Sequence, residues 1–290
     1  SVYFPAYSNT LAFNALAASL EAFSDIAGYV GADTCGCLLA IRQDQQEEIS
    51  LMIDIGTNGE MVLGNRERMV TCSTAAGPAF EGAKIECGMR GAAGAVDHVK
   101  YEDGKWNYTT VGNKPAVGLC GSGLIDLVAG LLDAGMLDEN GVLRSGQEKQ
   151  SVFILVPPER GGNERGVYLT QKDLGEVQLA KAAIAAGIQM LMERLGITED
   201  DICSVYIAGA FGNYMDPVSA GKIGLLPATL VKKVKPVGNA AGEGAKIALV
   251  NEKEMLEMDE LVRKIEFVEL AASADFQDHF IDKLGFETGE

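Results

Sequence analysis

The chain has 290 residues, 47% of them hydrophobic, which is enough to bury a substantial core in one large domain or two lobes. Its 41 acidic residues exceed its 24 basic residues by 17, and this negative charge would repel nucleic acid and anionic membrane surfaces. We therefore exclude both as partners. Any bound phosphate must be held by backbone N–H groups, a metal ion or a few local Lys and Arg side chains.

The cysteines and histidines exclude several kinds of metal site. The six cysteines form no C-x-x-C pair, and the chain has only two histidines, His98 and His279. A multi-His metal site and a four-Cys iron–sulfur cluster are therefore excluded, and buried thiols in a reducing compartment are expected. Because there is no signal peptide and no apolar run of 18 residues, the sequence predicts a cytoplasmic protein. The start at Ser1 predicts a domain of a longer chain.

Alternating helices and strands are predicted along the chain after an ambiguous segment at residues 1–27. In the first half we expect a tightly packed helix of small residues, two strands joined by a glycine turn, and a buried helix with Ser122 as its N-cap. Their predicted ranges are 28–41 for the first helix, 50–55 and 61–64 for the strands, and 118–137 for the buried helix.

The second half continues this alternation, which favours an α/β fold with a mainly parallel or mixed sheet. Lys181 lies on a mostly apolar helix, and we expect its side chain to reach solvent rather than a phosphate. Strands are predicted at residues 152–157, 167–170, 204–210, 234–237 and 265–270, and helices at 173–195, 240–250, 253–264 and 274–284.

The glycine turn after the first strand carries the strongest chemical signal. It reads Asp54-Ile55-Gly56-Thr57-Asn58-Gly59-Glu60. Its glycines permit close approach to a phosphate, Thr57 and Asn58 supply donors, and Asp54 is suited to hold hydrated Mg²⁺. The alternative is an ordinary hairpin with Asn58-Gly59 in a type I′ turn.

Two further glycine-rich segments follow much later in the chain. Gly209-Ala210-Phe211-Gly212 ends a predicted strand, where the lack of side chains would let an adenine lie against the backbone. The alternative is a glycine needed only for packing. Small residues at 238–245 open a helix that we expect to pack closely against another helix, as at the hinge of a two-lobed ATPase.

The order of these motifs resembles that of the actin/hexokinase/Hsp70 (ASKHA, ribonuclease H-like) superfamily. A small-residue helix, a D-x-G-T-x-G hairpin, a long insertion, an A-G-A-F-G segment and a second Gly/Ala-rich helix follow one another. Longer strings resemble the reductive activators of corrinoid enzymes more specifically. They are LMIDIGTNGEMVLGN, CSTAAGPAFEGAKIECGMRGAAGAVD, GLCGSGLIDLVAGLLDAGMLDENG, LTQKDLGEVQLAKAAIAAGI and YIAGAFGNYMDP, which together cover most of residues 28–250.

This resemblance implies an ATP-binding domain that docks on a corrinoid protein and helps to drive reduction of Co(II) corrinoid to Co(I) in methyl-transfer systems, with ATP and Mg²⁺ as cofactors. It implies an α/β ASKHA fold with a mixed sheet and flanking helices. Residues 1–49 would complete the first lobe and its connecting helix, and residues 50–290 would form the nucleotide-binding lobe, with an insertion near 65–200. A homodimer is left open.

The sequence departs from the family pattern at its start. It has neither the cysteines of the family's 2Fe-2S domain nor the first phosphate loop, so we expect electron transfer to need an N-terminal domain outside this chain and doubt complete ATP hydrolysis by this part alone. The alternatives are a non-catalytic module that docks on the corrinoid protein, or an activator ATPase of a 2-hydroxyacyl-CoA dehydratase-like enzyme.

Several residues outside the strongest motif are assigned lesser roles. Glu60 and Glu81 are candidates for the acid that positions water, although Glu81 equally suits a solvated loop. Gly121 and Ser122 open a helix whose free N–H groups are suited to a phosphate, with simple capping as the alternative. Gly209, Ala210, Phe211 and Gly212 are assigned to the adenosine.

Overall fold

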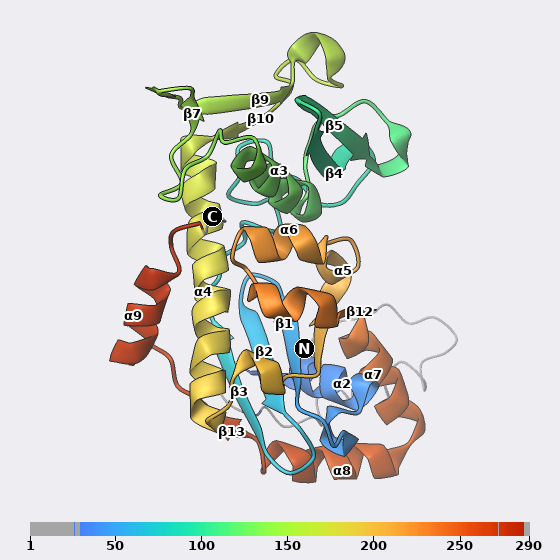
Figure 1. The fold of residues 1–290 in the computed structure, drawn as a ribbon. Helices are drawn as coiled ribbons and strands as arrows, with labels where there is room; N and C mark the ends of the chain where they lie inside the picture. The colour runs from blue at the N-terminus through green and yellow to red at the C-terminus, as the bar shows by residue number, and fades with distance from the viewer. Residues whose placement is uncertain (1–25, 27–29, 272, 287–290) are drawn as a thin grey trace, which may run out of the picture.

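A computed structural model describes Ile26, residues 30–271 and residues 273–286. The ambiguous segment at residues 1–27 lies almost wholly outside this part. A large mixed sheet with helices on both faces forms the lower half of the molecule in Figure 1, and a group of small sheets packed around one helix forms the upper half. The α/β class predicted from the alternating pattern is confirmed.

The large sheet has six strands within the described residues, in the order β12-β11-β1-β2-β3-β13. The central strand β1 pairs in parallel with β11 and antiparallel with β2, so the sheet is mixed. The strands are β1 (Ser50–Ile55), β2 (Gly59–Gly64), β3 (Met69–Thr74), β11 (Ser204–Ala208), β12 (Val234–Gly238) and β13 (Glu266–Phe267).

Strand β1 is buried on both faces because alternate side chains enter two different cores. Leu51 and Ile53 belong to the larger core, whereas Met52 belongs to a smaller core on the opposite face. This is the period of two expected of a strand between two layers of helices. A continuous apolar run such as residues 50–55 therefore predicts a central strand rather than an edge strand.

Helices cover the two faces of the large sheet. The long helix α4 (Gln171–Leu195) packs on β2 and β3, and α9 (Ala274–Asp282) packs against its outer side. Thr170 and Asp173 form a capping box at its start, in which each side chain accepts from the other residue's backbone N–H. The opposite face carries α2 (Ala32–Ile41), α7 (Ala240–Val250) and α8 (Glu252–Val262).

Helices α2 and α7 approach each other at glycine, as predicted for the two small-residue helices. A Cβ atom placed on Gly36 would lie 2.7 Å from the Ala241 carbonyl oxygen, and one placed on Gly244 would lie 1.9 Å from the Gly36 carbonyl oxygen. The two backbones are therefore in direct contact. Only residues without a side chain allow this approach.

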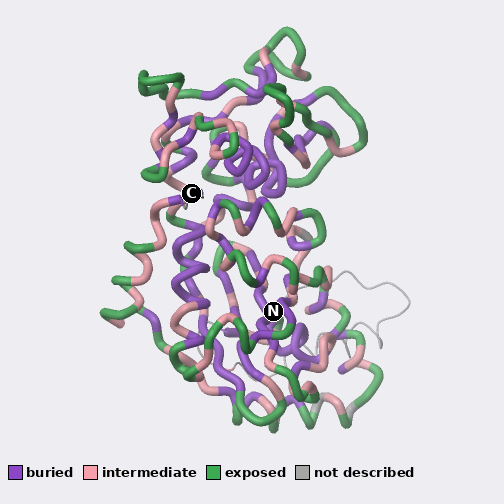
Figure 2. The backbone as a smooth tube through the Cα atoms, in the orientation of Figure 1, coloured by how far each residue is buried: buried purple, intermediate pink, exposed green. Residues whose placement is uncertain are grey.

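The upper half is organised around α3 (Gly121–Asp133), which is buried over most of its length (Figure 2). It packs on β4, and Trp106 of β5 lies 4.9 Å from both Tyr101 and Phe153, measured between ring centroids. The remaining strands are β4 (Ala95–Glu102), β5 (Lys105–Thr110), β6 (Gly118–Leu119), β7 (Arg144–Ser145), β8 (Glu148–Lys149), β9 (Val152–Val156) and β10 (Val167–Thr170).

Two short helices join the halves and correct one prediction. Helix α5 (Gly209–Gly212) begins directly after β11, so the strand predicted at residues 204–210 ends at Ala208. Gly209 has a φ of +85°, which turns the chain out of the sheet at that point. Helix α6 (Pro217–Lys222) follows, with Asp216 as its N-cap, and lies beneath α3 (Figure 1).

The expectation that Lys181 reaches solvent is wrong. Its side chain is almost fully buried at 1% exposure, and its Nζ donates a hydrogen bond to the Gly285 carbonyl and lies 5.1 Å from the centroid of the Phe286 ring. The C-terminal segment covers this part of α4, because Phe286 N also donates to the Glu139 carbonyl at 2.7 Å. The ammonium therefore holds residues 285–286 against α4.

Replacing Lys181 with methionine should lower the free energy of unfolding by about 1–3 kcal/mol, because the Gly285 carbonyl loses a charged donor while the apolar stem is kept. The C-terminal segment should also become sensitive to a carboxypeptidase or to limited proteolysis. Urea unfolding and a proteolysis time course measure the two effects. Lys172→Met, at an exposed position on the same helix, is the control. Unchanged stability and protease resistance in Lys181→Met would contradict this role.

Candidate functional site

A cavity of about 640 Å³ lies where the two halves meet, and its size suits a small-molecule ligand. Four of the residues predicted for the site line it: Glu81, Gly121, Ser122 and Phe211. They come from the loop after β3, the start of α3, and α5. The fold thus brings together segments that are far apart in the sequence.

The hairpin turn between β1 and β2 reaches this cavity through Ile55, which lines it, and Thr57 does not line it but bonds to Glu81, which does. The Thr57 hydroxyl donates to Glu81 Oε1 at 3.0 Å, and Gly77 N donates to the Thr57 carbonyl at 2.8 Å. These bonds hold the segment after β3 against the turn. Glu81 therefore has a defined partner and is not simply a solvated loop acid.

The turn itself differs from the two-residue hairpin that was the alternative. The loop consists of Gly56, Thr57 and Asn58, with Gly56 N donating to the Asn58 carbonyl at 2.9 Å, and Gly59 already pairs with Ile55 in the ladder. Asn58 and Gly59 are also absent from the positive-φ residues of the described chain, so they do not form a type I′ turn. Gly59 is needed for packing, since a Cβ there would lie 2.9 Å from Thr74 Oγ1.

Two predicted carboxylates, Asp54 and Glu60, lie opposite each other on the sheet face that carries α2, and neither lines the cavity. Asp54 pairs with Glu60 across the β1–β2 ladder, so their side chains share one face. Burial raises the pKa of both carboxyl groups, and the nearby charge of Asp33, in the first turn of α2, raises them further. Three acids are therefore held within electrostatic range of one another, a placement that favours a bound cation or proton.

Two buried thiols lie within the electrostatic influence of this acidic group. Cys37 Sγ lies 4.0 Å from Asp54 Oδ2, and burial raises the pKa of the Cys37 thiol well above its ordinary value. Burial and the charge of Glu60 do the same for Cys72. Both thiols therefore stay protonated. The prediction of buried thiols holds for Cys35, Cys37, Cys72 and Cys120, whereas Cys87 is half-buried and Cys203 is exposed.

Glu60→Gln should raise the melting temperature more at pH 8 than at pH 5. The pKa of Glu60 in the folded protein lies above its ordinary value. The contribution of Glu60 to the stability of the fold is therefore complete below the ordinary pKa, and it is lost as the pH rises through the raised pKa. Glutamine removes the charge and can still accept from Ser73 Oγ, which lies 3.3 Å from Glu60 Oε1. Thermal unfolding at both pH values, with exposed Glu148→Gln as the control for net charge, provides the measurement. Equal gains at both pH values would refute the electrostatic cause.

The segment predicted to contact adenosine divides between the two parts of the site. Gly209 lies beside Asp54, because a Cβ on Gly209 would be 3.0 Å from Asp54 Oδ1. Phe211 lines the cavity, where its ring stacks on Phe80 with centroids 5.8 Å apart. Ala210 and Gly212 complete α5, and Gly212 packs against Ile207. Any side chain at Gly209 would be strained by its positive φ, whether or not a ligand is present.

The start of α3 differs from the prediction in its capping. Cys120 is the N-cap residue, without a side-chain capping bond, and Ser122 lies within the first turn of the helix. Its hydroxyl donates to the Asp97 carbonyl at 2.8 Å. Ser122 is therefore not the N-cap. Its side chain bonds to β4 instead of capping the helix. Its backbone N–H and that of Gly121 still lie at the positive end of the helix dipole, next to the cavity.

The sequence interpretation missed Arg90 and Tyr214, which also line the cavity. Arg90 is exposed within the glycine-rich segment Gly88-Met89-Arg90-Gly91, and Tyr214 follows the A-G-A-F-G motif with 63% exposure. An arginine flanked by glycine was the signal that could have identified the first. Among the described residues, no group of three or more His, Cys, Asp or Glu side chains is placed to hold a metal ion directly.

Residues 48–290 match the family described as the C-terminal domain of RACo, the ASKHA domain. The chain is 38% identical over 271 residues to the corrinoid activation enzyme RamQ of Eubacterium limosum, covering 88% of this chain and 45% of that protein. It is 29% identical over 283 residues to the Co(II) methylated amine-specific corrinoid protein reductase of Methanosarcina barkeri, covering 89% and 50%.

A solved structure agrees with these relatives. The reductive activator for corrinoid, iron-sulfur protein superposes with a TM-score of 0.84 at 40% identity, over 91% of this chain and 44% of that one. The chain thus spans about half the length of the relatives that it matches. Within the part of the chain that the structure describes, no helix is both long and apolar enough to cross a membrane. The family match and the fold agree with the resemblance seen in the motifs, and the chain belongs to the RACo C-terminal family of ASKHA domains.

Proposed function

We propose that this domain binds ATP·Mg²⁺ and docks on a corrinoid protein, and that within the longer protein it drives the reduction of Co(II) corrinoid to Co(I) for methyl transfer. The names of the relatives support the corrinoid partner, and the ASKHA family supports nucleotide binding. Electrons would enter through a 2Fe-2S domain outside this chain. A homodimer remains a prediction.

The observation that carries nucleotide binding is the cavity at the junction of the two halves. Backbone N–H groups of Gly121 and Ser122 would hold a phosphate at the start of α3, and Arg90 would add a positive charge. The rings of Phe80 and Phe211 offer an apolar wall to a base. A volume of about 640 Å³ accommodates a nucleotide.

The donors at the sheet end fit a hydrated Mg²⁺ better than a fully coordinated ion. Magnesium keeps several waters in nucleotide sites and needs only one or two carboxylates, so Asp54 suffices as its anchor. The bound metal would neutralise charge on the phosphates. Glu60 and Glu81 would orient water, because Glu60 lies across the ladder from Asp54 and Glu81 lines the cavity.

Coupling to the corrinoid follows from differential binding. A nucleotide can change the partner only if it favours one arrangement of the complex over another. The cavity lies between the two halves. Nucleotide binding would therefore favour one relative position of the two halves and change the surface presented to the corrinoid protein.

The test uses the full-length protein with a Co(II) corrinoid protein, Mg²⁺ and a low-potential reductant, following the absorbance of Co(I). ATP should stimulate the appearance of Co(I), and omission of ATP or its replacement with ADP should prevent it. Binding of the corrinoid protein without ATP turnover would favour the non-catalytic docking module instead. Absence of both ATP binding and corrinoid-protein binding would refute the proposed function.

A further inference from the structure

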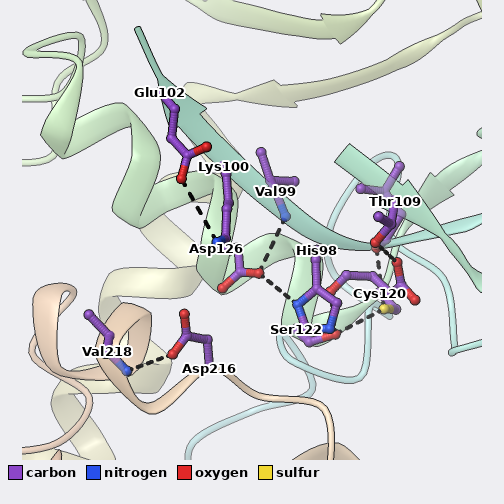
Figure 3. Close-up of polar contacts among 12 residues, drawn as sticks. His98, Val99, Lys100, Glu102, Thr109, Cys120, Ser122, Asp126, Asp216 and Val218 are labelled. Carbon is purple, nitrogen blue, oxygen red and sulfur yellow. Dashed lines mark hydrogen bonds and ion pairs between the residues drawn. The ribbon is translucent and has the colours of Figure 1, made fainter. Parts of the chain in front are cut away.

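A second, smaller cavity lies between α3 and α6, apart from the proposed nucleotide site. Its volume is about 270 Å³, which suits the end of one side chain rather than a nucleotide. We call it the α3–α6 pocket and define it by His98 and Lys100 of β4, Asp126 and Asp133 of α3, and Asp216, Ser219 and Lys222 at α6. Figure 3 shows several of these residues.

Asp126 is the unusual group in this pocket. Its side chain is only 4% exposed, and Oδ2 accepts from His98 Nδ1 at 3.1 Å and from Val99 N at 3.3 Å (Figure 3). The other oxygen, Oδ1, is buried without a formed hydrogen bond to any described residue. The Ser219 hydroxyl lies close enough to help lower the pKa of Asp126, but burial has the larger effect and raises that pKa.

A buried carboxylate oxygen without a donor is costly, because it has lost water and gained nothing in its place. Native proteins pair nearly all such atoms, so an exception at the wall of a cavity indicates a missing donor. The Ser219 hydroxyl is near the carboxylate, but no described residue completes a hydrogen bond to Oδ1, so a donor from outside these residues would satisfy it. A ligand with N–H groups and a positive charge would satisfy both the lone pair and the charge.

The other charges of the pocket agree with a cationic ligand. Its acids are Glu102, Asp126, Asp133 and Asp216, and its bases are Lys100 and Lys222, which leaves an excess of two negative charges with His98 neutral. Both lysines have partners, since Lys222 Nζ lies 2.5 Å from Asp133 and Lys100 Nζ lies 3.8 Å from Glu102. Asp126 and Asp216 are left without a cationic lysine or arginine in the pocket.

Two exposed side chains offer contacts to a protein partner, one at the pocket and one at the neighbouring nucleotide cavity. Val218 lines the pocket and is 54% exposed, and Tyr214, four residues earlier, is 63% exposed beside the nucleotide cavity. A tyrosine near a pocket suited to an arginine side chain agrees with interface hot spots, which are enriched in Tyr and Arg. The two cavities are also neighbours along β4, because Asp97 lines one and His98 lines the other.

We propose that the α3–α6 pocket receives a guanidinium or ammonium group from a basic side chain of the corrinoid protein, which donates to Asp126 Oδ1. The identity of this partner rests on the proposed function, whereas the preference of the pocket for a cation does not. A guanidinium is favoured, because its planar donors match a carboxylate and are weakly hydrated. The position of the pocket next to the nucleotide cavity would place this contact where the two halves of the domain meet.

Methylguanidinium chloride is the first probe, because it carries the guanidinium group by itself. The chain has only two histidines, which makes the imidazole NMR signals a simple readout. In protein labelled with ¹⁵N-histidine, the imidazole signals of His98 should shift and saturate with methylguanidinium, while those of His279 on α9 should stay unchanged. Sodium chloride at equal ionic strength controls for screening. Tetramethylammonium controls for charge without N–H donors. A shift that does not saturate, or that both control salts reproduce, would overturn the cation site.

Two variants separate binding from folding. Asp126→Asn removes the charge and should weaken methylguanidinium binding at least tenfold, and Val218→Lys should do the same by placing an ammonium at the rim without altering the His98–Asp126 pair. Asp278→Asn, exposed on α9, is the matched control and should bind as the wild type does. Retention of wild-type affinity by Val218→Lys, in a protein with normal thermal unfolding, would overturn the proposed location.

The partner is tested by titrating a Co(II) corrinoid protein into the full-length wild type and the same variants. Asp126→Asn and Val218→Lys should each bind it at least tenfold more weakly, whereas ATP binding should be unchanged. Equal affinity in variants that no longer bind methylguanidinium would show that the corrinoid protein does not supply the cation. Absence of binding even to the wild type would refute the proposed function, while the methylguanidinium titration would still decide whether the pocket accepts a cation.

Discussion

ATP turnover by the full-length protein should fall by at least about 100-fold in Asp54→Asn, the scale on which a group that stabilises developing charge contributes to catalysis. Asp54 is the half-buried penultimate residue of β1, lies across the ladder from Glu60 and is close to Gly209 of α5. Asparagine has the same shape but no charge to hold hydrated Mg²⁺. Release of phosphate from ATP, measured with and without the corrinoid protein, gives the result.

The fold should survive this substitution. Burial and the charge of Asp33 raise the pKa of Asp54. The ionised carboxylate of Asp54 therefore lowers the stability of the fold, and a neutral asparagine removes this destabilisation. Asp278→Asn is the matched control, because it removes the same charge from an exposed position on α9 and should retain most of the turnover. Wild-type turnover in a normally folded Asp54→Asn would reduce Asp54 to a structural residue.

The elements predicted well from sequence are those whose apolar runs or periodicity are unbroken. The strand at residues 50–55 and the helix at 240–250 have the predicted bounds, and α4 begins two residues before the predicted Asp173. Each is buried on faces that the alternation of side chains reveals directly. The sheet order could not be read in this way. It depends on which strands meet in space, as β1 and β11 do across a long intervening segment.

The strands that the sequence did not predict have mixed or exposed patterns. Strand β3 has two apolar residues followed by threonine, cysteine, serine and threonine, and β5 is largely exposed, with Trp106 half-buried against α3. Such strands are stabilised by their cross-strand neighbours more than by their own composition. From the sequence alone, residues 65–117 were therefore interpreted as loops and motifs, and their strands were not predicted.

The candidate site shows the same division between local and long-range information. The hairpin from Asp54 to Glu60 was predicted because its chemistry is contiguous in the sequence. The cavity was not, because Arg90 and Tyr214 meet Glu81 only after folding. Lys181 was misread for a related reason, since its partner at Gly285 is distant in sequence and the local apolar pattern gives no sign of it.

Gly244→Ala should lower the free energy of unfolding by about 1–3 kcal/mol, although alanine is the better helix former by about 1 kcal/mol. The new Cβ would lie 1.9 Å from the Gly36 carbonyl oxygen, and backbone cannot rotate away as a side chain can. Helices α2 and α7 must therefore separate. Urea unfolding measures the loss of stability, provided that the dependence of the free energy of unfolding on urea concentration is unchanged. If this contact is the hinge between the lobes, nucleotide binding by the full-length protein should also weaken.

Gly175→Ala supplies the matched control. Gly175 lies inside α4, and a Cβ there would meet nothing within 4 Å, so only the helix propensity changes and stability should rise by up to about 1 kcal/mol. The two substitutions are chemically identical and differ only in what the added methyl group meets. Opposite signs would therefore locate the backbone contact between α2 and α7. Stabilisation by both would show that these helices are not packed at glycine, and the hinge assigned to them would lose its structural basis.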